Sequence, residues 1–341
     1  MKKKILILLL VFALVFPVTG CFEKATVESL LKDAAEKLEK TESYEFTGEL
    51  DIDVSIEIQT MSVGVLAEGK ADVSVTEDAT HIKGSGSVKA MDENEDAEFE
   101  IYMMEGKDEI TVYADMGEGW TKSVTEDEDE VDDVLMVLEA VKIHNLIDIL
   151  SDHDDDLELA DDTEKVGKNK AYVIEGTVSG EYLEDLLKSI DVDEIQDEVD
   201  SMLEETDVDF SDYEVEIRLL IDTKTKLPVS LELDFADAVT KIVEEVMETM
   251  MGFQSMYDDE MDYEDYDEDY DEDDEDDEDD EDPADEISVK VKTCRIELEF
   301  ASFNEVDEIE VPKKVRDSAK ENENGLLDGD MIDDVIDEID V

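Results

Sequence analysis

Strict alternation of apolar and polar residues dominates the first part of the chain. From Tyr44 to Ile58 the apolar side chains fall on even positions, and the odd positions carry polar, mostly acidic ones. This period of two is typical of an antiparallel strand with one buried face and one wet face. The segment is about three times the usual strand length, so we expect a tall, curved sheet.

The same alternation recurs further along the chain and predicts a meander of hairpins. Turn residues such as Gly106 and Gly117 separate the segments. In the last segment the apolar phase changes near Thr293–Cys294, which predicts a β-bulge there. The further strands are expected at 80–90, 98–104, 109–115, 119–124, 172–178, 213–221, 229–235 and 287–303.

Apolar residues at helical spacing predict amphipathic helices before and between these strands. The first helix is expected over 26–40, with Thr26 as its N-cap. A sheet with one long apolar face needs a cover, and helices at 131–150 and 180–203 are expected to supply it. Further helical segments are expected at 237–256 and, as a short helix, within 325–341.

The N-terminus predicts export and attachment to a membrane. Three lysines precede an apolar run, 5–16, which has the length of a signal-peptide core and is too short to span a bilayer. Val18-Thr19-Gly20-Cys21 then resembles the lipobox of prokaryotic lipoproteins. The resemblance implies removal of residues 1–20 and a lipid on Cys21 with acyl chains such as palmitate, two of which bind a membrane stably. The alternative is an ordinary secretory signal in which Cys21 is incidental.

Acidity extends over the whole chain, whose formal net charge is −78. The run 258–286 contains 23 acids in 29 residues and is expected to be disordered by self-repulsion. It holds less than a quarter of the 106 acids, so the charge is not confined to one tail. Nucleic acid is excluded as a partner because phosphate binding needs basic patches. Adsorption to anionic headgroups is also disfavoured, which makes the lipid on Cys21 more necessary.

No catalytic or metal-binding constellation stands out, so we expect neither an enzyme nor a cofactor. Gly84-Ser85-Gly86-Ser87 is not a nucleophile elbow and is expected to mark a turn or kink. His153 beside Asp154–Asp156 is interpreted as a solvated loop, and the acidic run lacks the glycine of a calcium-binding loop. Cys294, the only other cysteine, is interpreted as a small buried hydrophobe.

Three stretches give the chain a family resemblance: 43–48 after the first helix, Asp222-Thr223-Lys224-Thr225-Lys226-Leu227-Pro228 as a hairpin, and 303–312 closing the last strand. They resemble LolA/LppX-like prokaryotic lipoproteins, including their poorly characterised surface members. The resemblance implies an α+β fold, a half-barrel of curved antiparallel β-sheet with helices packed on its concave face. It also implies an apolar cavity between them, although helix side chains could instead fill that space.

The expected organisation follows from these patterns. A signal peptide (1–20) precedes a half-barrel domain (21–315), which is interrupted by an insertion (237–286) and followed by an acidic tail (316–341). We expect a lipoprotein on the outer side of the cell membrane that binds an apolar or lipid-like ligand. The expected lipidation site is Cys21. The expected cavity residues are Phe46, Ile52, Leu138, Leu186 and Met247. The alternative is a surface interaction protein whose acidic run binds cations or basic partners.

Overall fold

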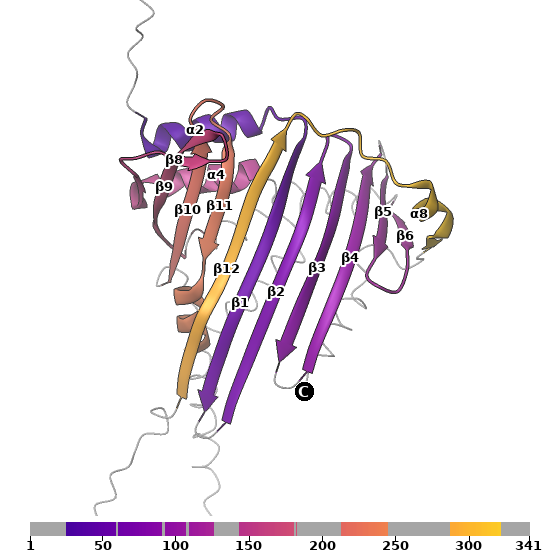
Figure 1. Cartoon of the computed structure of the whole chain (residues 1–341), viewed down its shortest axis with the longest axis horizontal. Helices are drawn as coiled ribbons and strands as arrows, with labels where there is room; N and C mark the ends of the chain where they lie inside the picture. Colours follow the sequence, from indigo (N-terminus) through magenta and orange to yellow (C-terminus); the bar gives the residue numbers. More distant parts are fainter. Residues whose placement is uncertain are drawn as a thin grey trace, which may run out of the picture.

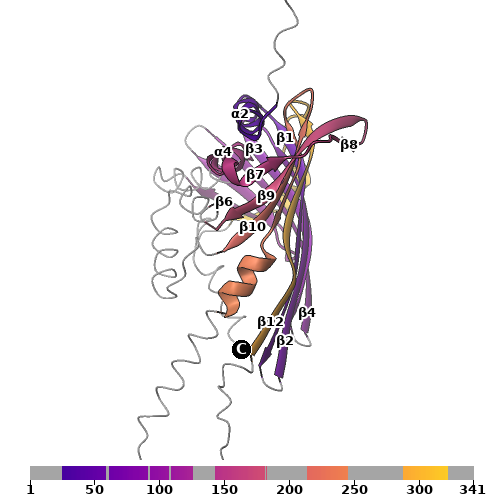
Figure 2. The same ribbon diagram turned by 90° about the vertical axis from the view of Figure 1, so that its left-hand side faces the viewer.

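One large, unclosed, curved sheet makes up most of the protein (Figures 1 and 2). The computed structural model describes residues 25–58, 61–90, 93–106, 109–125, 143–180, 182, 213–244 and 287–321. Within these residues, thirteen strands join in this sheet in the order β13-β6-β5-β4-β3-β2-β1-β12-β11-β10-β9-β7, with β8 paired to β9.

Five long strands form the middle of the sheet. They are β1 (Tyr44–Ile58), β2 (Met61–Val75), β3 (Ala79–Ala90), β4 (Glu93–Glu105) and β12 (Ile287–Phe303). The chain's last long strand, β12, pairs antiparallel with β1 from Tyr44↔Phe303 to Ile58↔Ile287. It also pairs with β11, so β12 joins the meander β1–β6 to the strands of the second half.

Shorter strands complete both ends of the sheet. Their bounds are β5 (Ile110–Asp115), β6 (Thr121–Thr125), β7 (Leu157–Leu159), β8 (Glu164–Val166), β9 (Asn169–Ser179), β10 (Glu214–Asp222), β11 (Pro228–Asp234) and β13 (Lys320–Glu321). All pairings among them are antiparallel except that of β13 with β6, which is parallel and makes the sheet mixed.

The structure confirms the strands expected from alternation and adds one long strand that the sequence analysis missed. In β2 the apolar residues occupy odd positions, but Gly64 and Gly69 carry no side chain and Leu66 falls on the polar phase. These interruptions weaken the period of two. β2 nevertheless pairs with β1 along its whole length, from Tyr44↔Val75 to Ile58↔Met61.

The expected bulge in the last strand is present. Asp53 pairs with Thr293 and Val54 pairs with Val291, so Lys292 is the extra residue. An extra residue returns the apolar side chains to one face after the sequence changes phase. A second register shift, at Ala301 between Phe300 and Ser302, was not predicted.

Helix α2 (Val27–Leu38) begins as the sequence predicts. The Thr26 hydroxyl accepts a hydrogen bond from Ser29 N, and the Ser29 hydroxyl accepts one from Thr26 N, so the two residues form a capping box. Its apolar stripe, which includes Leu30, Leu31 and Ala34, is buried. Helix α4 (Ile143–Asp152) overlaps the last part of the segment expected to be helical at 131–150, ends two residues beyond it, and is followed by a 3₁₀ turn at Asp154–Asp156.

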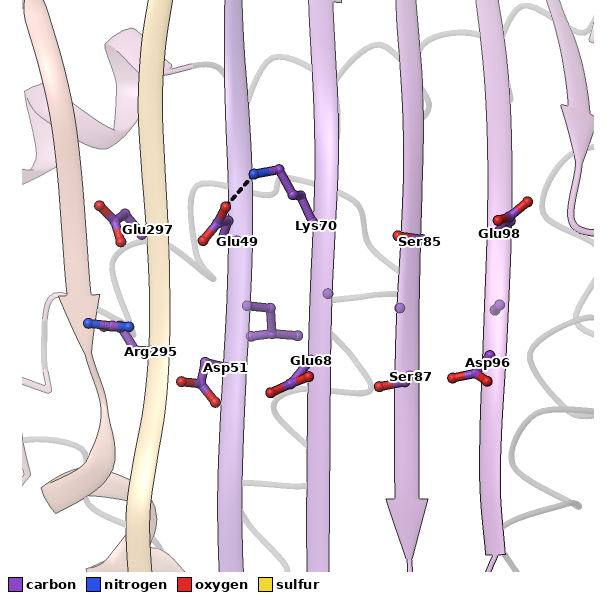
Figure 3. Close-up of a pocket in the computed structure, with 14 residues that line it drawn as sticks. Glu49, Asp51, Glu68, Lys70, Ser85, Ser87, Asp96, Glu98, Arg295 and Glu297 are labelled. Atoms are coloured by element: carbon purple, nitrogen blue, oxygen red, sulfur yellow. Dashed lines mark hydrogen bonds and ion pairs between the residues drawn. The ribbon is translucent and has the colours of Figure 1, made fainter.

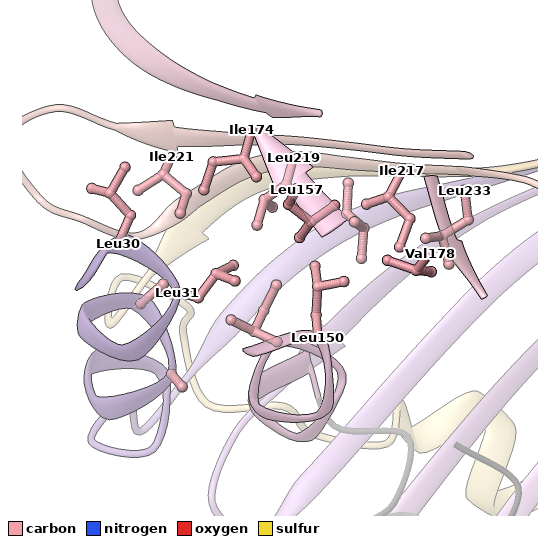
Figure 4. Packing of buried hydrophobic residues seen from close by; sticks show 14 of the residues in the cluster. Leu30, Leu31, Leu150, Leu157, Ile174, Val178, Ile217, Leu219, Ile221 and Leu233 are labelled. Atoms are coloured by element: carbon pink, nitrogen blue, oxygen red, sulfur yellow. The ribbon is translucent and has the colours of Figure 1, made fainter. Parts of the chain in front are cut away.

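The main core lies where α2 and α4 pack against the β7–β11 end of the sheet (Figure 4). Leu30 and Leu31 from α2 and Leu150 from α4 face a layer of strand side chains. That layer consists of Leu157, Ile174, Val178, Val215, Ile217, Leu219, Ile221, Leu231 and Leu233. Helices α2 and α4 therefore cover one end of the sheet, whereas the sequence analysis expected a helical cover over its concave face. The helix expected at 237–256 is present over 236–244, and its remainder lies outside the described residues. The remaining predicted cover, at 131–142 and 183–203, lies outside the described residues.

After β12 the chain runs along one end of the sheet to its far edge (Figure 1). Helix α8 (Lys313–Ser318) packs there through Val315 against Tyr102 and Tyr113, and β13 then pairs with β6. The expected tail from 316 thus begins inside α8, while the helix expected within 325–341 lies outside the described residues.

Candidate functional site

The alternation of the strands produces one apolar face that runs across the sheet. Register places Leu298, Gly48 and Ala71 side by side on this face, and likewise Cys294, Ile52 and Ala67. The same face continues through Leu231, Leu219 and Ile174 into the core beneath α2 and α4. The core and the apolar side of the long strands are therefore one continuous surface.

The two ends of this apolar face differ sharply in exposure. Leu219, Ile174 and Leu231, beneath the helices, are fully buried. On the long strands, Leu50 and Val65 are each 38% exposed and Val88 is 50% exposed. We call the apolar side of β1–β4 and β12 the open apolar face. Exposed apolar area of this kind marks a place where an apolar ligand or partner can bind.

Two of the predicted cavity residues lie on this face. Phe46 is half-buried near the core, with its ring centroid 6.2 Å from that of Tyr44 and 5.8 Å from that of Phe300. Ile52 is half-buried further along β1, beside Cys294 and Ala67. The structure thus places Phe46 and Ile52 on one surface but does not show that they bind a ligand.

The other predicted site residues lie outside the described residues. These are Cys21, Leu138, Leu186 and Met247, together with the acidic run 258–286. Sequence reasoning missed Val65 and Val88, which are more exposed than Phe46 or Ile52. The signal that could have found Val65 is the odd-position alternation of Met61–Val75.

Cys294 is half-buried on the open apolar face. Burial raises the pKa of its thiol, and the nearby carboxylate of Asp234 raises it further. A raised pKa keeps the thiol protonated at neutral pH, and only the thiolate is a strong nucleophile. The structure therefore assigns Cys294 a packing role.

Glycines on the open apolar face let neighbouring groups approach the backbone. A Cβ on Gly84 would lie 2.4 Å from Cζ of Phe99 and 2.8 Å from the Lys70 carbonyl oxygen. The Phe99 ring therefore lies across Gly84. The sequence 84–87 was expected to mark a turn or kink, but it lies in the middle of β3. That interpretation was wrong because small residues here make room for a cross-strand ring.

The opposite face of the long strands is polar and hollowed into a shallow trough of about 640 Å³ (Figure 3). Carboxylates line it on both sides of a floor made of Ser85, Gly86 and Ser87. Lys70 pairs with Glu49, whose hydrogen bond and negative charge raise the pKa of the lysine. Within the part of the chain that the structure describes, no group of three or more His, Cys, Asp or Glu side chains is arranged to hold a metal ion.

The β10–β11 turn has the geometry that its sequence implies. Asp222 Oδ1 accepts hydrogen bonds from the backbone N–H groups of Lys224 and Thr225, both at 2.8 Å. Burial alone would raise the pKa of this carboxyl, but the two hydrogen bonds outweigh burial and hold its pKa below the usual range. Lys226 takes a positive φ of 62° to close the turn, and its ammonium lies 4.2 Å from the centre of the Tyr172 ring.

The fold and the open apolar face define a single-sheet protein with one helix-covered end. Comparison with protein families places the chain in DUF6612, a family of unknown function, whose model matches residues 26–264. The chain therefore belongs to this family. No curated protein matches it.

The chain shows a distant likeness to solved structures. The crystal structure of LprF from Mycobacterium bovis matches 84% of this chain and 96% of its own length, at 9% identity and a TM-score of 0.34. At this TM-score the resemblance to LolA/LppX-like lipoproteins stays a prediction. None of the helices described has the length and apolar character needed to cross a bilayer.

Proposed function

We propose that this protein is a lipoprotein, held on the outer side of the cell membrane by a lipid on Cys21, that binds an apolar or lipid-like ligand on its open apolar face. The observation that supports the proposal most is the difference in side-chain exposure along the apolar face of the sheet. Its aliphatic side chains are fully buried beneath α2 and α4, yet up to 50% exposed at Val88 on the long strands.

The exposed aliphatic groups suit an apolar ligand, which needs no hydrogen bonds from the protein. Leu50, Val65 and Val88 offer only dispersion contacts and the release of water, worth about 25 cal/mol per Å² buried. The ligand should be long, because β1 alone has 15 residues and extends about 50 Å. An acyl chain or another elongated apolar group satisfies both conditions. A strongly anionic ligand is disfavoured by the net charge of −78.

Titration with an uncharged fluorescent acyl probe tests the ligand. A variant carrying Leu50→Gln, Val65→Thr and Val88→Thr keeps the strands but removes apolar area, so its affinity should fall on the order of ten-fold. A matched control carries Glu49→Gln, Glu68→Gln and Ser87→Thr on the other face of the same strands and should bind as the original chain does. Absence of saturable binding, or equal loss in both variants, would show the proposal to be wrong.

The anchor is tested separately. Intact-mass measurement of the chain isolated from membranes should show loss of residues 1–20 and a diacylglyceryl group on the new N-terminal Cys21. The variant Cys21→Ser should be released from the membrane fraction, because the signal sequence alone leaves no acyl chain to hold the product. Retention of Cys21→Ser in that fraction would contradict the lipid anchor without bearing on the apolar ligand.

A further inference from the structure

Two short lysine-rich segments meet at one end of the sheet. Residues 165–170 comprise the turn between β8 and β9 with the adjoining ends of both strands, and residues 223–227 form the turn between β10 and β11. Thr223 N donates to Lys170 O at 2.9 Å, which joins the two turns. Lys37, near the end of α2, donates from its ammonium to Thr225 O and so adds a further cation.

These segments have a composition unlike that of the rest of the chain. Together the eleven residues contain five lysines and no acid, whereas the whole chain has 106 acids against 28 bases. Lys165, Lys168, Lys170 and Lys224 are exposed, and Lys226 lies over Tyr172. We call the residues 165–170 and 223–227, with Lys37, the basic tip.

The basic tip lies at the end of the sheet where the N-terminal segment enters. Figure 1 shows α2, β8 and the β10–β11 turn together at this end, while β1 runs away from it. Only a few residues separate Cys21 from Thr26, the N-cap of α2. A lipid on Cys21 would therefore hold this end, and no other, within reach of the headgroup layer.

We propose that the basic tip docks on the anionic lipid headgroups of the membrane. The proposal rests on the proposed function only for the anchor, and not for the apolar ligand. The sequence analysis disfavoured such contact because the whole chain is acidic. However, charges are screened beyond about 8–10 Å at physiological salt, so only those near the surface matter. The far ends of the long strands, about 50 Å away, do not oppose the contact.

The docked tip sets the orientation of the molecule. Lysines draw the tip to the surface, and carboxylates over the rest of the sheet are repelled by the same headgroups. The long strands then stand away from the membrane, with the open apolar face roughly perpendicular to it. A flexible tether alone would leave the sheet free to tumble.

The test uses the lipidated full chain, in which the lipid blocks the Cys21 thiol, with a fluorophore attached at Asn169→Cys in a Cys294→Ser background. The chain is mixed with millimolar lipid as phosphatidylcholine vesicles, with or without one-third phosphatidylglycerol, that carry a headgroup quencher. Quenching then reports contact of the tip whether or not the chain is anchored. We expect quenching on the anionic vesicles at about 0.1 M salt and its loss at 0.5 M salt.

Matched variants separate the tip from net charge. Lys168→Gln, Lys170→Gln and Lys224→Gln together should weaken the contact about 100-fold, at about fivefold per lysine. The control Lys89→Gln, Lys290→Gln and Lys292→Gln makes the same charge change at the far end of β3 and β12 and should leave quenching unchanged. Equal quenching on the two kinds of vesicle, or equal loss in the two variants, would overturn the proposal. A loss of quenching on addition of soluble inorganic phosphate, without a preference between the two kinds of vesicle, would also count against it.

Discussion

Asp222 is a buried carboxylate whose function is to hold the β10–β11 turn. Its pKa lies below the usual range because two backbone N–H groups donate to its ionised form. The same turn presents Lys224 and Lys226 at the basic tip. A single side chain therefore links the local geometry of the hairpin to the surface that we propose meets the membrane.

Stability should depend on pH through Asp222. Because its folded pKa is depressed, its contribution is fully present above the unfolded pKa of about 3.9 and is lost as pH falls through the lower folded value. Asp222→Asn should cost about 1–2 kcal/mol at pH 7 and much less near pH 3. Urea unfolding at both pH values measures the difference. An equal cost at the two pH values would contradict the role of the charge.

Tyr182 gives a second prediction at the same scale. Its side chain is fully buried in the core, and among the described residues its hydroxyl has no hydrogen-bond partner. Burial raises the pKa of that hydroxyl. Removing an unsatisfied buried polar group should not destabilise, so Tyr182→Phe should leave the free energy of unfolding unchanged or raise it by up to about 1 kcal/mol. A decrease in the free energy of unfolding by more than about 1 kcal/mol would instead reveal a partner for the hydroxyl.

At the scale of elements, β12 determines how the two halves of the sheet meet. The extra residue Lys292 lets the apolar side chains on either side of it point to one face. Its ammonium also lies 3.0 Å from Asp53 Oδ2, an exposed ion pair of small energetic value.

Deletions within β12 test the bulge. Removing Lys292 should be tolerated, because the apolar residues then alternate without interruption from Ile287 to Phe300. Removing Glu297 instead shifts the alternation by one residue, so the apolar side chains on one side of the deletion move to the polar face of the sheet. This deletion should abolish cooperative unfolding. Thermal unfolding followed by circular dichroism distinguishes the two outcomes, and equal damage by both deletions would contradict this account of the bulge.

At the scale of the whole molecule, repulsion across the polar face opposes folding. Glu297 lies directly opposite Glu49 on β1 and Glu232 on β11. Like charges in such pairs destabilise a sheet, and salt screens them. The protein should therefore unfold at a higher temperature as potassium chloride rises from low concentration.

One substitution isolates this repulsion. Glu297→Gln should raise stability by about 0.5–1 kcal/mol at low salt and reduce the dependence on salt. The control Glu98→Gln removes the same charge opposite Ser85 and should do less. If both variants respond alike, net charge rather than the cross-strand pairs determines the effect.

The sequence by itself determined the local elements. Alternation located β1, β9–β11 and β12, the phase change located the bulge within two residues, and Thr26 marked the start of α2. These features follow from backbone geometry, since side chains alternate along a strand and repeat every 3.6 residues along a helix. β2 was missed because glycines weaken that same signal.

Only the tertiary structure decided which elements meet. β12 pairs with β1 although the two strands lie far apart in the sequence; Lys292 and Asp53, which form an ion pair between them, are 239 positions apart. No local period specifies such a partner. The same pairing decides that helices bury one end of the apolar face and leave Leu50, Val65 and Val88 exposed. Hydrogen bonds from Thr223 to Lys170 and from Lys37 to Thr225 also gather lysines from two separate hairpins and α2 at one tip, which the average charge of the chain conceals. Periodicity records how each segment divides its own side chains between two faces, whereas exposure and local charge depend on what packs against each face.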